Sequence, residues 1–566
     1  MGDLMDDDVI PLVRKYALQN ALEYDGKGQV GSTLGRLLSE RQDLRPKAKD
    51  LMSLVSKEVV DANKSMNENG ADHVRREIEN IDPSAVNRVR QEKNAGLKPL
   101  ENTKGGVVLR FAPNPNGPLS LGHSRGVVIN KHYVENHDGK IVLRFDDTDT
   151  VVKPPLVEAY DWIIEDFEWL TGSKPDISIK ASERMPIYLK YAEKLLTEGY
   201  GYVCECSSDE FKKHRMSMVP CPHRNRPVEE NLKLWSIMLN GGREPGDAII
   251  RVKTDMTLPN PALRDWPAWR IQKNIHPVVG DLYNVWPLLD FQSAIEDHEQ
   301  GVTHIIRGKD LMDSTRKQIL LYDHFGWTYP ETLYWGRVSI HDQGSFSTST
   351  MREGIDSGVY DGWDDPRLPT LMSMRKRGYD PNAIKSFWTE MGITQKDVAI
   401  SLDSLNAVNS AKIDPTSRRI SVIMDPVEID ITGDVPEKAV LPFHPDNQSL
   451  GNRHHSTKMG RVVIERVDLE DEIRLKDFAD ISNVENNYQI ISTKKSDDRK
   501  IINWISAESI KDCTLVMPDG VDLVRKSCVV EDTELFVGEV IQMERNGFAK
   551  VMEWSDDSRV LHWLHR

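Results

Sequence analysis

Arg110-Phe-Ala-Pro-Asn-Pro-Asn-Gly-Pro-Leu-Ser-Leu-Gly-His123 links a short apolar run, Val107–Leu109, to a segment of helical character that starts at Ser124. The apolar run is typical of a buried strand, so we expect a strand, a Gly/Pro-rich bend and a helix N-terminus in this order. Glycines let the backbone approach a ligand, and a helix N-terminus offers free N–H groups and partial positive charge. This arrangement is suited to binding phosphate. Its spacing is not that of the Rossmann dinucleotide fingerprint, and it lacks the lysine of a P-loop.

A second apolar run, at 141–145, follows the expected helix at 124–135 and completes a strand–helix–strand unit. Such a unit implies a parallel sheet that binds ligands at the carboxyl ends of its strands. Strand signals return at 302–307 and 332–338. Before them lies a stretch of different character, 199–290, which we expect to be an insertion into the sheet.

Charged side chains gather where the second strand ends, in Leu143-Arg-Phe-Asp-Asp-Thr-Asp149. Carboxylates and an arginine at such a place are costly unless they meet a ligand, a metal or one another. A capped helix start is the alternative, because Asp and Thr cap helices well. Arg110 suits a substrate carboxylate, which a guanidinium binds through two parallel hydrogen bonds; an ion pair with Asp146 or Asp147 is its alternative role.

Three of the five cysteines lie close together in the sequence, as Cys204, Cys206 and Cys221, and His223 follows. Three thiolates and an imidazole suit a structural, tetrahedral Zn²⁺. Two unrelated surface pairs are the alternative, and His214 is a competing ligand. So few cysteines form no disulfide framework, and they favour a reducing cytoplasm.

The composition describes a multidomain globular chain of 566 residues, with 39% hydrophobic and 29% charged residues. We expect no membrane partner, because no apolar run reaches about eighteen residues. The acidic start, MGDLMDDDVI, lacks the apolar segment of a secretory signal. A net charge of −16 argues mildly against nucleic-acid binding, but local basic clusters such as 212–215 and 375–377 decide that question.

The remaining segments have patterns of their own. Apolar residues recur at helical spacing before residue 100, which predicts a helical appendage with a loop at 63–70. Residues 352–412 are helical in character again. After residue 420, short alternating segments and the turn signal Asn546-Gly547 predict β-barrels.

The string from Arg110 to His123 resembles the R-F-A-P-x-P-x-G-x-L-x-x-G-H signature of class I aminoacyl-tRNA synthetases, in the form of the glutamyl/glutaminyl branch. The stretch 143–149 is similar to the L-R-x-E/D-D-T-D element of glutamyl enzymes, and glutaminyl enzymes usually carry Asn where Asp149 stands. The C-terminal part resembles the barrels of archaeal glutamyl and of glutaminyl enzymes, whereas bacterial glutamyl enzymes are helical there. The likeness to archaeal-type glutamyl-tRNA synthetases runs from about residue 105 to the end.

This resemblance implies a multidomain fold with an α/β Rossmann-like catalytic domain. The expected parts are an N-terminal helical extension (1–104), the catalytic domain (105–351) with an inserted acceptor-binding domain (199–290), a helical stem-contact region (352–414) and anticodon-binding β-barrels (415–566).

The implied activity is that of a cytoplasmic glutamate–tRNA ligase in protein biosynthesis. L-glutamate would be activated with ATP and Mg²⁺ and transferred to the 3′ end of tRNA-Glu, with tRNA-Gln as an open alternative. Structural Zn²⁺ is the other implied cofactor, and synthetase or elongation-factor partners stay unknown. Two other functions remain open: a glutaminyl-tRNA synthetase, and a tRNA-binding scaffold with weakened catalysis.

The resemblance also implies roles for individual residues. The glutamate-binding residues expected are Arg110, Ala112, Asn114, Asp146 and Arg307. The ATP-binding residues expected are Gly117, Gly122, His123, Ser347 and Ser349. The catalytic residues expected are Ser120, Gly122, His123, Ser347, Thr348 and Ser349. The metal ligands expected are Cys204, Cys206, Cys221 and His223.

The sequence departs from the family pattern at three places. Ser120 stands at the first signature histidine, and Leu289 stands where a tyrosine usually contacts the amino acid. The third signature, Ser345-Phe-Ser-Thr-Ser349, has no lysine for the pyrophosphate leaving group, although Arg352 lies just beyond. Slow activation is one expected consequence, and these departures keep the scaffold alternative open.

Overall fold

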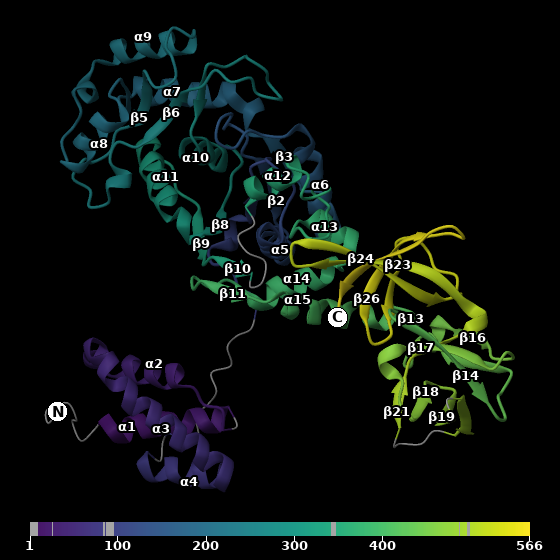
Figure 1. Cartoon of the computed structure of the whole chain (residues 1–566). Helices are drawn as coiled ribbons and strands as arrows, with labels where there is room; N and C mark the ends of the chain where they lie inside the picture. Colours follow the sequence, from purple (N-terminus) through teal and green to yellow (C-terminus); the bar gives the residue numbers. More distant parts are fainter. Residues whose placement is uncertain are drawn as a thin grey trace. The chain divides into compact units, whose positions relative to one another are not determined.

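The structure is a computed structural model that describes residues 9–24, 26–82, 85, 96–340, 347–485, 487–494 and 499–566. It divides into two compact units, Met1–Asn94 and Ala95–Arg566 (Figure 1).

The N-terminal unit is a helical bundle, coloured purple in Figure 1. Its helices are α1 (Val9–Glu23), α2 (Val30–Glu40), α3 (Ala48–Asn69) and α4 (Ala71–Ile81). Their apolar faces share one core, which includes Val13, Leu37 and Val55. The loop expected at 63–70 is wrong, because α3 continues to Asn69. The side chain of Asn63, within α3, makes two hydrogen bonds to Gly28. Its Oδ1 accepts from Gly28 N at 2.7 Å, and its Nδ2 donates to the carbonyl of Gly28 at 2.9 Å.

Residues 106–340 are built on a parallel sheet. Its strands are β1 (Val108–Phe111), β2 (Lys140–Phe145), β3 (Ile177–Lys180), β8 (His304–Gly308) and β9 (Glu331–Trp335). β1 pairs with β2, β2 with β3 and β8 with β9, all in parallel. Thr303 N donates to the carbonyl of Val108 at 2.9 Å, which brings the two groups of strands together. Helices α5 (Leu121–Asn136) and α6 (Val157–Thr171) pack on this sheet. The expected strand–helix–strand unit is confirmed.

A second, antiparallel sheet lies within the stretch expected to be an insertion. Its order is β4-β5-β6-β7. The strands are β4 (Gly201–Cys204), β5 (Ile249–Val252), β6 (Pro267–Ile271) and β7 (Val285–Pro287), accompanied by α8 (Ser208–Met216) and α9 (Val228–Leu239). Trp235, Trp269 and Trp286 are buried in its core, so this stretch has apolar packing of its own. After β7, α10 (Leu289–Glu299) and α11 (Met312–Phe325) return the chain to the parallel sheet.

Four helices follow this region between residues 347 and 414, as the helical pattern predicts. They are α12 (Thr348–Asp356), α13 (Leu371–Arg377), α14 (Pro381–Met391) and α15 (Leu402–Ile413). A short parallel pair, β10 (Val338–Ile340) with β11 (Val398–Ile400), crosses this region and was not expected from the sequence.

Two seven-stranded sheets form the C-terminal part. In the first, β12 (Arg419–Ile420) and β13 (Val422–Ile423) lie at opposite ends of the strand order, yet only Ser421 separates them. In the second, β21 (Lys500–Ile502) and β22 (Trp504–Ser506) lie at opposite ends, and only Asn503 separates them. Each sheet must therefore curl until its edges meet, which is the geometry of a β-barrel.

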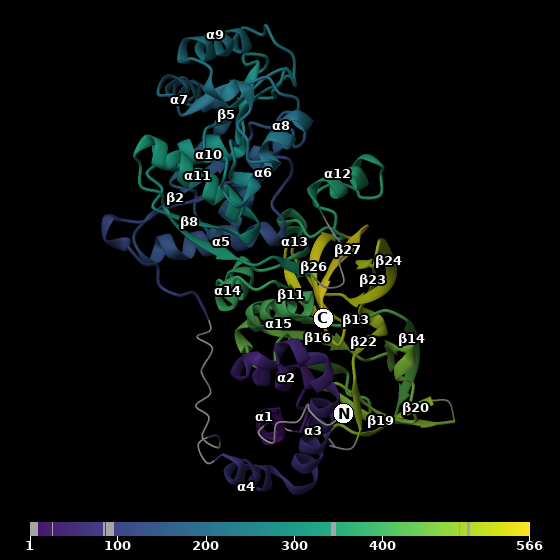
Figure 2. The same cartoon turned by 90° about the vertical axis from the view of Figure 1, so that its left-hand side faces the viewer.

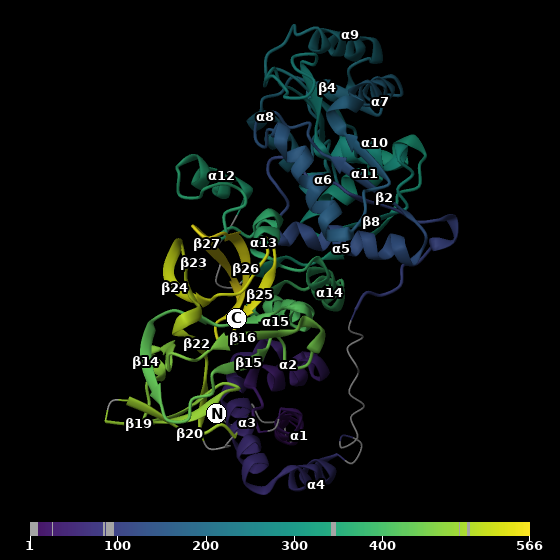
Figure 3. The same ribbon diagram turned by 90° about the vertical axis from the view of Figure 1, so that its right-hand side faces the viewer.

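Helix α13 contacts both the first C-terminal sheet and helix α6, and Figures 2 and 3 show it beside the yellow strands. Arg377 donates to the carbonyl of Leu564, in β27 (Arg559–His565). Lys550 Nζ donates to the carbonyl of Arg375 at 3.0 Å. The basic cluster 375–377 thus makes internal contacts as well as facing solvent. No helix among the described residues is long and apolar enough to cross a membrane.

Candidate active site

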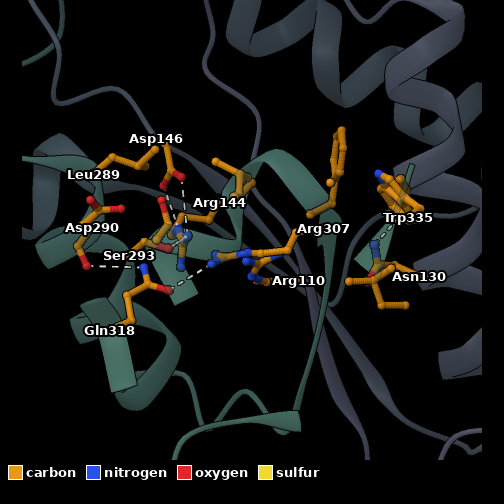
Figure 4. A pocket seen from close by; sticks show the side chains of 17 residues that line it. Arg110, Asn130, Arg144, Asp146, Leu289, Asp290, Ser293, Arg307, Gln318 and Trp335 are labelled. Atoms are coloured by element: carbon orange, nitrogen blue, oxygen red, sulfur yellow. Dashed lines mark hydrogen bonds and ion pairs between the residues drawn. The ribbon is translucent and has the colours of Figure 1, made fainter. Parts of the chain in front are cut away.

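A cavity of about 220 Å³ opens at the carboxyl ends of β1, β2 and β8, where a parallel sheet binds its ligands. Arg110 comes from β1, Arg144 from β2 and Arg307 from β8. Asp146 follows β2, and Gln318 comes from α11. Figure 4 shows these side chains around one space. Of the glutamate-binding residues expected, Arg110, Ala112, Asp146 and Arg307 line this cavity, whereas Asn114 does not.

Arg144 is the centre of a buried network. It donates to Asp146 Oδ1 from Nε, to Asp297 Oδ1 from Nη1 and to Ser293 Oγ from Nη2, each at 2.7 Å. Gln292 adds a second donor to Asp146, at 3.0 Å. Burial disfavours the charged guanidinium, but Asp146 and Asp297 outweigh that effect and raise the pKa of Arg144. Asp146 is therefore held in place before any ligand binds.

Arg110 pairs with Asp297, at 3.4 Å, and not with Asp146 or Asp147 as the alternative role supposed. Asp297 belongs to α10, far along the chain, so strand neighbours could not reveal it. Burial lowers the pKa of Arg110 to about 10, and Asp297 opposes this shift. For Asp297 itself burial is again the largest effect, but the charges of Arg110, Arg144 and Arg307 outweigh it and lower its pKa.

Arg307 is a buried cation with neutral partners. Its Nη1 donates to Thr315 Oγ1 at 3.2 Å and to Gln318 Oε1 at 3.0 Å. Its Nε has no partner, and no ion pair joins it to a carboxylate within the described ranges. Asp290, the other acid at the cavity, is already paired with Lys317 at 2.7 Å.

The other carboxylates of the 143–149 element lie away from the cavity. Asp147 accepts from Tyr160 Oη and from Ser182 N and Oγ, and burial raises its pKa. Asp149 accepts from Val151 N and Val152 N, at 3.0 Å each, and pairs with Arg270 of β6. Of these three carboxylates only Asp146 lines the cavity, whereas Asp147 and Asp149 are bound by donors of the protein.

Ser120 and His123 form the N-terminal cap of α5. The hydroxyl of Ser120 accepts from His123 N, and the imidazole of His123 accepts from Ser120 N at 3.2 Å. Gly122 and His123 are exposed to solvent. Desolvation by nearby protein atoms, followed by the charge of Lys153, lowers the pKa of His123, which favours the neutral imidazole.

Backbone contacts hold this loop from both sides. Ser120 and Thr370 form an isolated antiparallel β-bridge through the main chain on either side of them. Leu121 N donates to the carbonyl of Pro369 at 2.9 Å, and Leu371 N donates to that of Leu119 at 2.8 Å. Asp166 of α6 accepts from Leu119 N at 3.2 Å. Its other oxygen has no partner in the described part of the chain, and burial raises the pKa of Asp166 to about 7.

The third signature segment touches the first. Ser347 caps α12 by accepting from Thr350 N at 3.1 Å, and its hydroxyl lies 2.9 Å from that of Ser349. Residues 341–346, which include the start of this signature, lie outside the described residues. A Cβ on Gly117 would come within 2.7 Å of Thr348 Cγ2. Gly117 is thus the place where the two signature segments pack, whereas a Cβ on Gly122 would meet Ser120 Oγ at 3.7 Å, an ordinary contact distance.

Two family models match consecutive stretches of this chain. The model described as tRNA synthetases class I (E and Q), catalytic domain, matches residues 106–415, and the anti-codon binding domain model of the same family matches 417–496. The chain belongs to this family of class I tRNA synthetases. The family resemblance inferred from the signature at 110–123 is therefore confirmed.

Relatives of this synthetase match nearly its whole length. The glutamate–tRNA ligase of Methanothrix thermoacetophila is 42% identical over 99% of this chain and 100% of its own. That of Archaeoglobus fulgidus is 43% identical over 98% of this chain and 99% of its own. Among solved structures, a glutamate tRNA ligase from Elizabethkingia meningosepticum in complex with its amino acid is 23% identical, with a TM-score of 0.41 over 55% of this chain and 70% of that one.

The inserted region of the synthetase brings Cys204, Cys206, Cys221 and His223 together, with their ligand atoms all within 4.8 Å of one another. The Sγ atoms of Cys204 and Cys221 are 3.9 Å apart. A tetrahedral Zn²⁺ with Zn–S bonds of about 2.3 Å places two sulfurs at roughly this separation. His214, the competing ligand, is not part of the cluster.

Several residues of the synthetase's site were missed from the sequence: Arg144 as a network centre, Gln292, Ser293, Asp297 and Gln318. Gln292, Ser293, Glu296 and Asp297 form one buried polar face of α10. Four polar residues at spacings of one, four and five lie on one side of a helix. That pattern was a usable signal, whereas Gln318 gave none.

Proposed function

We propose that this synthetase is a glutamate–tRNA ligase. The α-carboxylate of L-glutamate attacks the α-phosphate of ATP, which forms glutamyl-adenylate and releases pyrophosphate. The terminal ribose hydroxyl of tRNA then attacks the glutamyl carbonyl, and AMP leaves. Mg²⁺, when bound with ATP, neutralises phosphate charge. The protein contributes position and electrostatics, with no covalent nucleophile of its own.

The charge balance of the cavity is the observation that carries this proposal. Three guanidiniums, those of Arg110, Arg144 and Arg307, face two carboxylates, those of Asp146 and Asp297. One positive charge remains, and it belongs to Arg307, whose partners are neutral. A buried cation that no carboxylate contacts favours an anionic ligand. Glutamate brings one carboxylate more than glutamine, so it suits this cavity better.

We assign the remaining roles in the reaction as follows. Asp146 binds the α-amino group of glutamate in the cavity that Arg110 and Ala112 also line, and Asn114 supports it by donating to the carbonyl of Asp146 at 2.9 Å. Gly117, Gly122 and His123 with Ser347 and Ser349 bind ATP, while Ser120 and Thr348 shape the two loops. The inserted sheet binds the acceptor end, the helices of 352–414 contact the stem, and the barrels read the anticodon.

The cluster of Cys204, Cys206, Cys221 and His223 holds a structural Zn²⁺. Three sulfurs and one nitrogen fill all four tetrahedral positions, so no position is left for chemistry. Reduced thiols at these positions fit a cytoplasmic location.

Two alternatives predict different products. A glutaminyl-tRNA synthetase would charge glutamine, and a scaffold would charge neither amino acid. The deciding experiment is aminoacylation with radiolabelled glutamate and glutamine on purified tRNA-Glu and tRNA-Gln. We expect glutamate on tRNA-Glu; glutamate on both tRNAs would mean that the enzyme does not discriminate between them. Glutamine charging, or no charging with active tRNA, would overturn the proposal.

A further inference from the structure

Arg307 owes its uncompensated charge to the residue beside it. Gln318 lies on α11 and is 1% exposed. Its Oε1 accepts from Arg307 Nη1 at 3.0 Å, and this contact is drawn in Figure 4. The guanidinium is thus held by an oxygen that carries only a partial negative charge.

Two further contacts determine which end of the Gln318 amide faces Arg307. Tyr329 Oη donates to Oε1 at 2.6 Å. On the other side, Nε2 donates to the carbonyl of Asp290 at 3.2 Å. An amide rotated by 180° would turn its NH₂ group towards two donors, Arg307 Nη1 and Tyr329 Oη. It would lose these hydrogen bonds and the one to Asp290. Gln318 therefore keeps an acceptor towards Arg307.

An amide and a carboxylate at this position have the same size but opposite consequences. A carboxylate 3.0 Å from Nη1 would form a buried ion pair, and the cavity would lose its one surplus positive charge. A substrate carboxylate would then compete with a permanent one. The amide orients the guanidinium and leaves its charge available.

We propose that Gln318 is a positioning residue that sets the preference for a carboxylate over an amide in the bound amino acid. It acts through Arg307, which it holds without neutralising. This inference rests on the proposed function, because it assigns the carboxylate of glutamate to Arg307.

The test is the isosteric variant Gln318→Glu, assayed by tRNA-dependent ATP–pyrophosphate exchange with glutamate and with glutamine. We expect KM for glutamate to rise roughly 10- to 100-fold, with a smaller change in kcat, because one charge-assisted contact is lost. The ratio of kcat/KM for glutamate to that for glutamine should fall by a similar factor. Gln318→Met removes the hydrogen bonds without adding charge, and it should keep glutamate the preferred substrate.

A second pair of variants guards against misfolding of Gln318→Glu. Thr315 is the other partner of Nη1, at 3.2 Å, so Thr315→Asp brings a carboxylate from another direction, and Thr315→Asn is its neutral match. Thermal unfolding identifies which variants fold. An unchanged glutamate-to-glutamine ratio in a folded acidic variant would overturn the inference, as would an equal fall in Gln318→Met. A wild-type enzyme that charges no glutamate would instead contradict the proposed function.

Discussion

Arg352 donates from Nη2 to the carbonyl oxygen of Asn116 at 2.8 Å and so joins the third signature segment to the first. The loop that lacks a lysine thus uses its nearest arginine to fix the geometry of the site. This hydrogen bond holds the two segments together, which reduces the ordering that ligand binding requires.

Replacing Arg352 by Ala should separate the two segments. A hydrogen bond from a charged donor contributes about 1.5–3 kcal/mol, so kcat/KM for ATP should fall roughly 10- to 100-fold. Arg352→Lys, which keeps the charge and a single donor, should lose less. ATP–pyrophosphate exchange measures both variants, and wild-type values in Arg352→Ala would contradict this role.

Gly117→Ala should disturb the same contact by crowding. The new Cβ would meet Thr348 Cγ2 at 2.7 Å and the Trp363 ring at 3.1 Å. Such overpacking costs about 1–3 kcal/mol, and we expect kcat/KM for ATP to fall by roughly a factor of 10. Thr348→Ser removes the methyl group that Cβ would meet, so the double variant should recover part of the loss. No recovery would show that Gly117 acts through something other than Thr348.

The metal cluster can be tested by counting zinc. Purified protein should contain one zinc per chain, and Cys206→Ser should lower its zinc affinity by more than roughly 100-fold, because one of four ligands is lost. The thermal unfolding midpoint should fall with the zinc content. His214→Ala is the matched control and should retain the metal. Full occupancy in Cys206→Ser would exclude this ligand set.

Asp166 should make stability depend on pH. Burial raises its pKa to about 7 in the folded chain, from 3.8 ordinarily. The native state therefore binds more protons between these values, and the contribution of Asp166 to stability is lost as pH rises towards 7. Arg375 and Glu165 are the charges that act on it, and Leu119 N is its donor.

Asp166→Asn keeps an acceptor for Leu119 N and removes the titration. Between pH 5 and pH 8, the stability of the wild type relative to this variant should fall by on the order of 2 kcal/mol. Urea unfolding at the two pH values measures it. A constant difference would mean that Asp166 does not titrate in this range.

The sequence was most informative where function needs a contiguous string. The strands and helix around Arg110–His123 and the cluster at Cys204 could be predicted, because local spacing and side-chain type were sufficient there. The C-terminal sheets were indicated too, since short alternating strands predict sheets, but the edge strands at 419–420 and 500–506 were not predicted.

Contacts between distant segments could not be predicted in the same way. Arg110 pairs with Asp297, which is 187 positions away, and no local pattern encodes that choice. Asn63 looked like a loop residue because its intrinsic helix preference is weak, and its partner Gly28 lies in another segment. The sequence predicted that Arg307 lies in the amino-acid pocket. It could not predict the neutral contacts that leave its charge available, because these depend on Gln318 and Tyr329.

The bridge between Ser120 and Thr370 consists of main-chain atoms. Because these hydrogen bonds use main-chain atoms, side-chain substitutions leave them intact, except for proline, which removes the N–H at residue 121 or 371. Changing the length of the chain between the bridge and the barrel by one residue would have the opposite effect. It would shift the register of the bridge between Ser120 and Thr370 while leaving every side chain of the active site intact. Insertions and deletions, more than point mutations, would reveal this part of the enzyme.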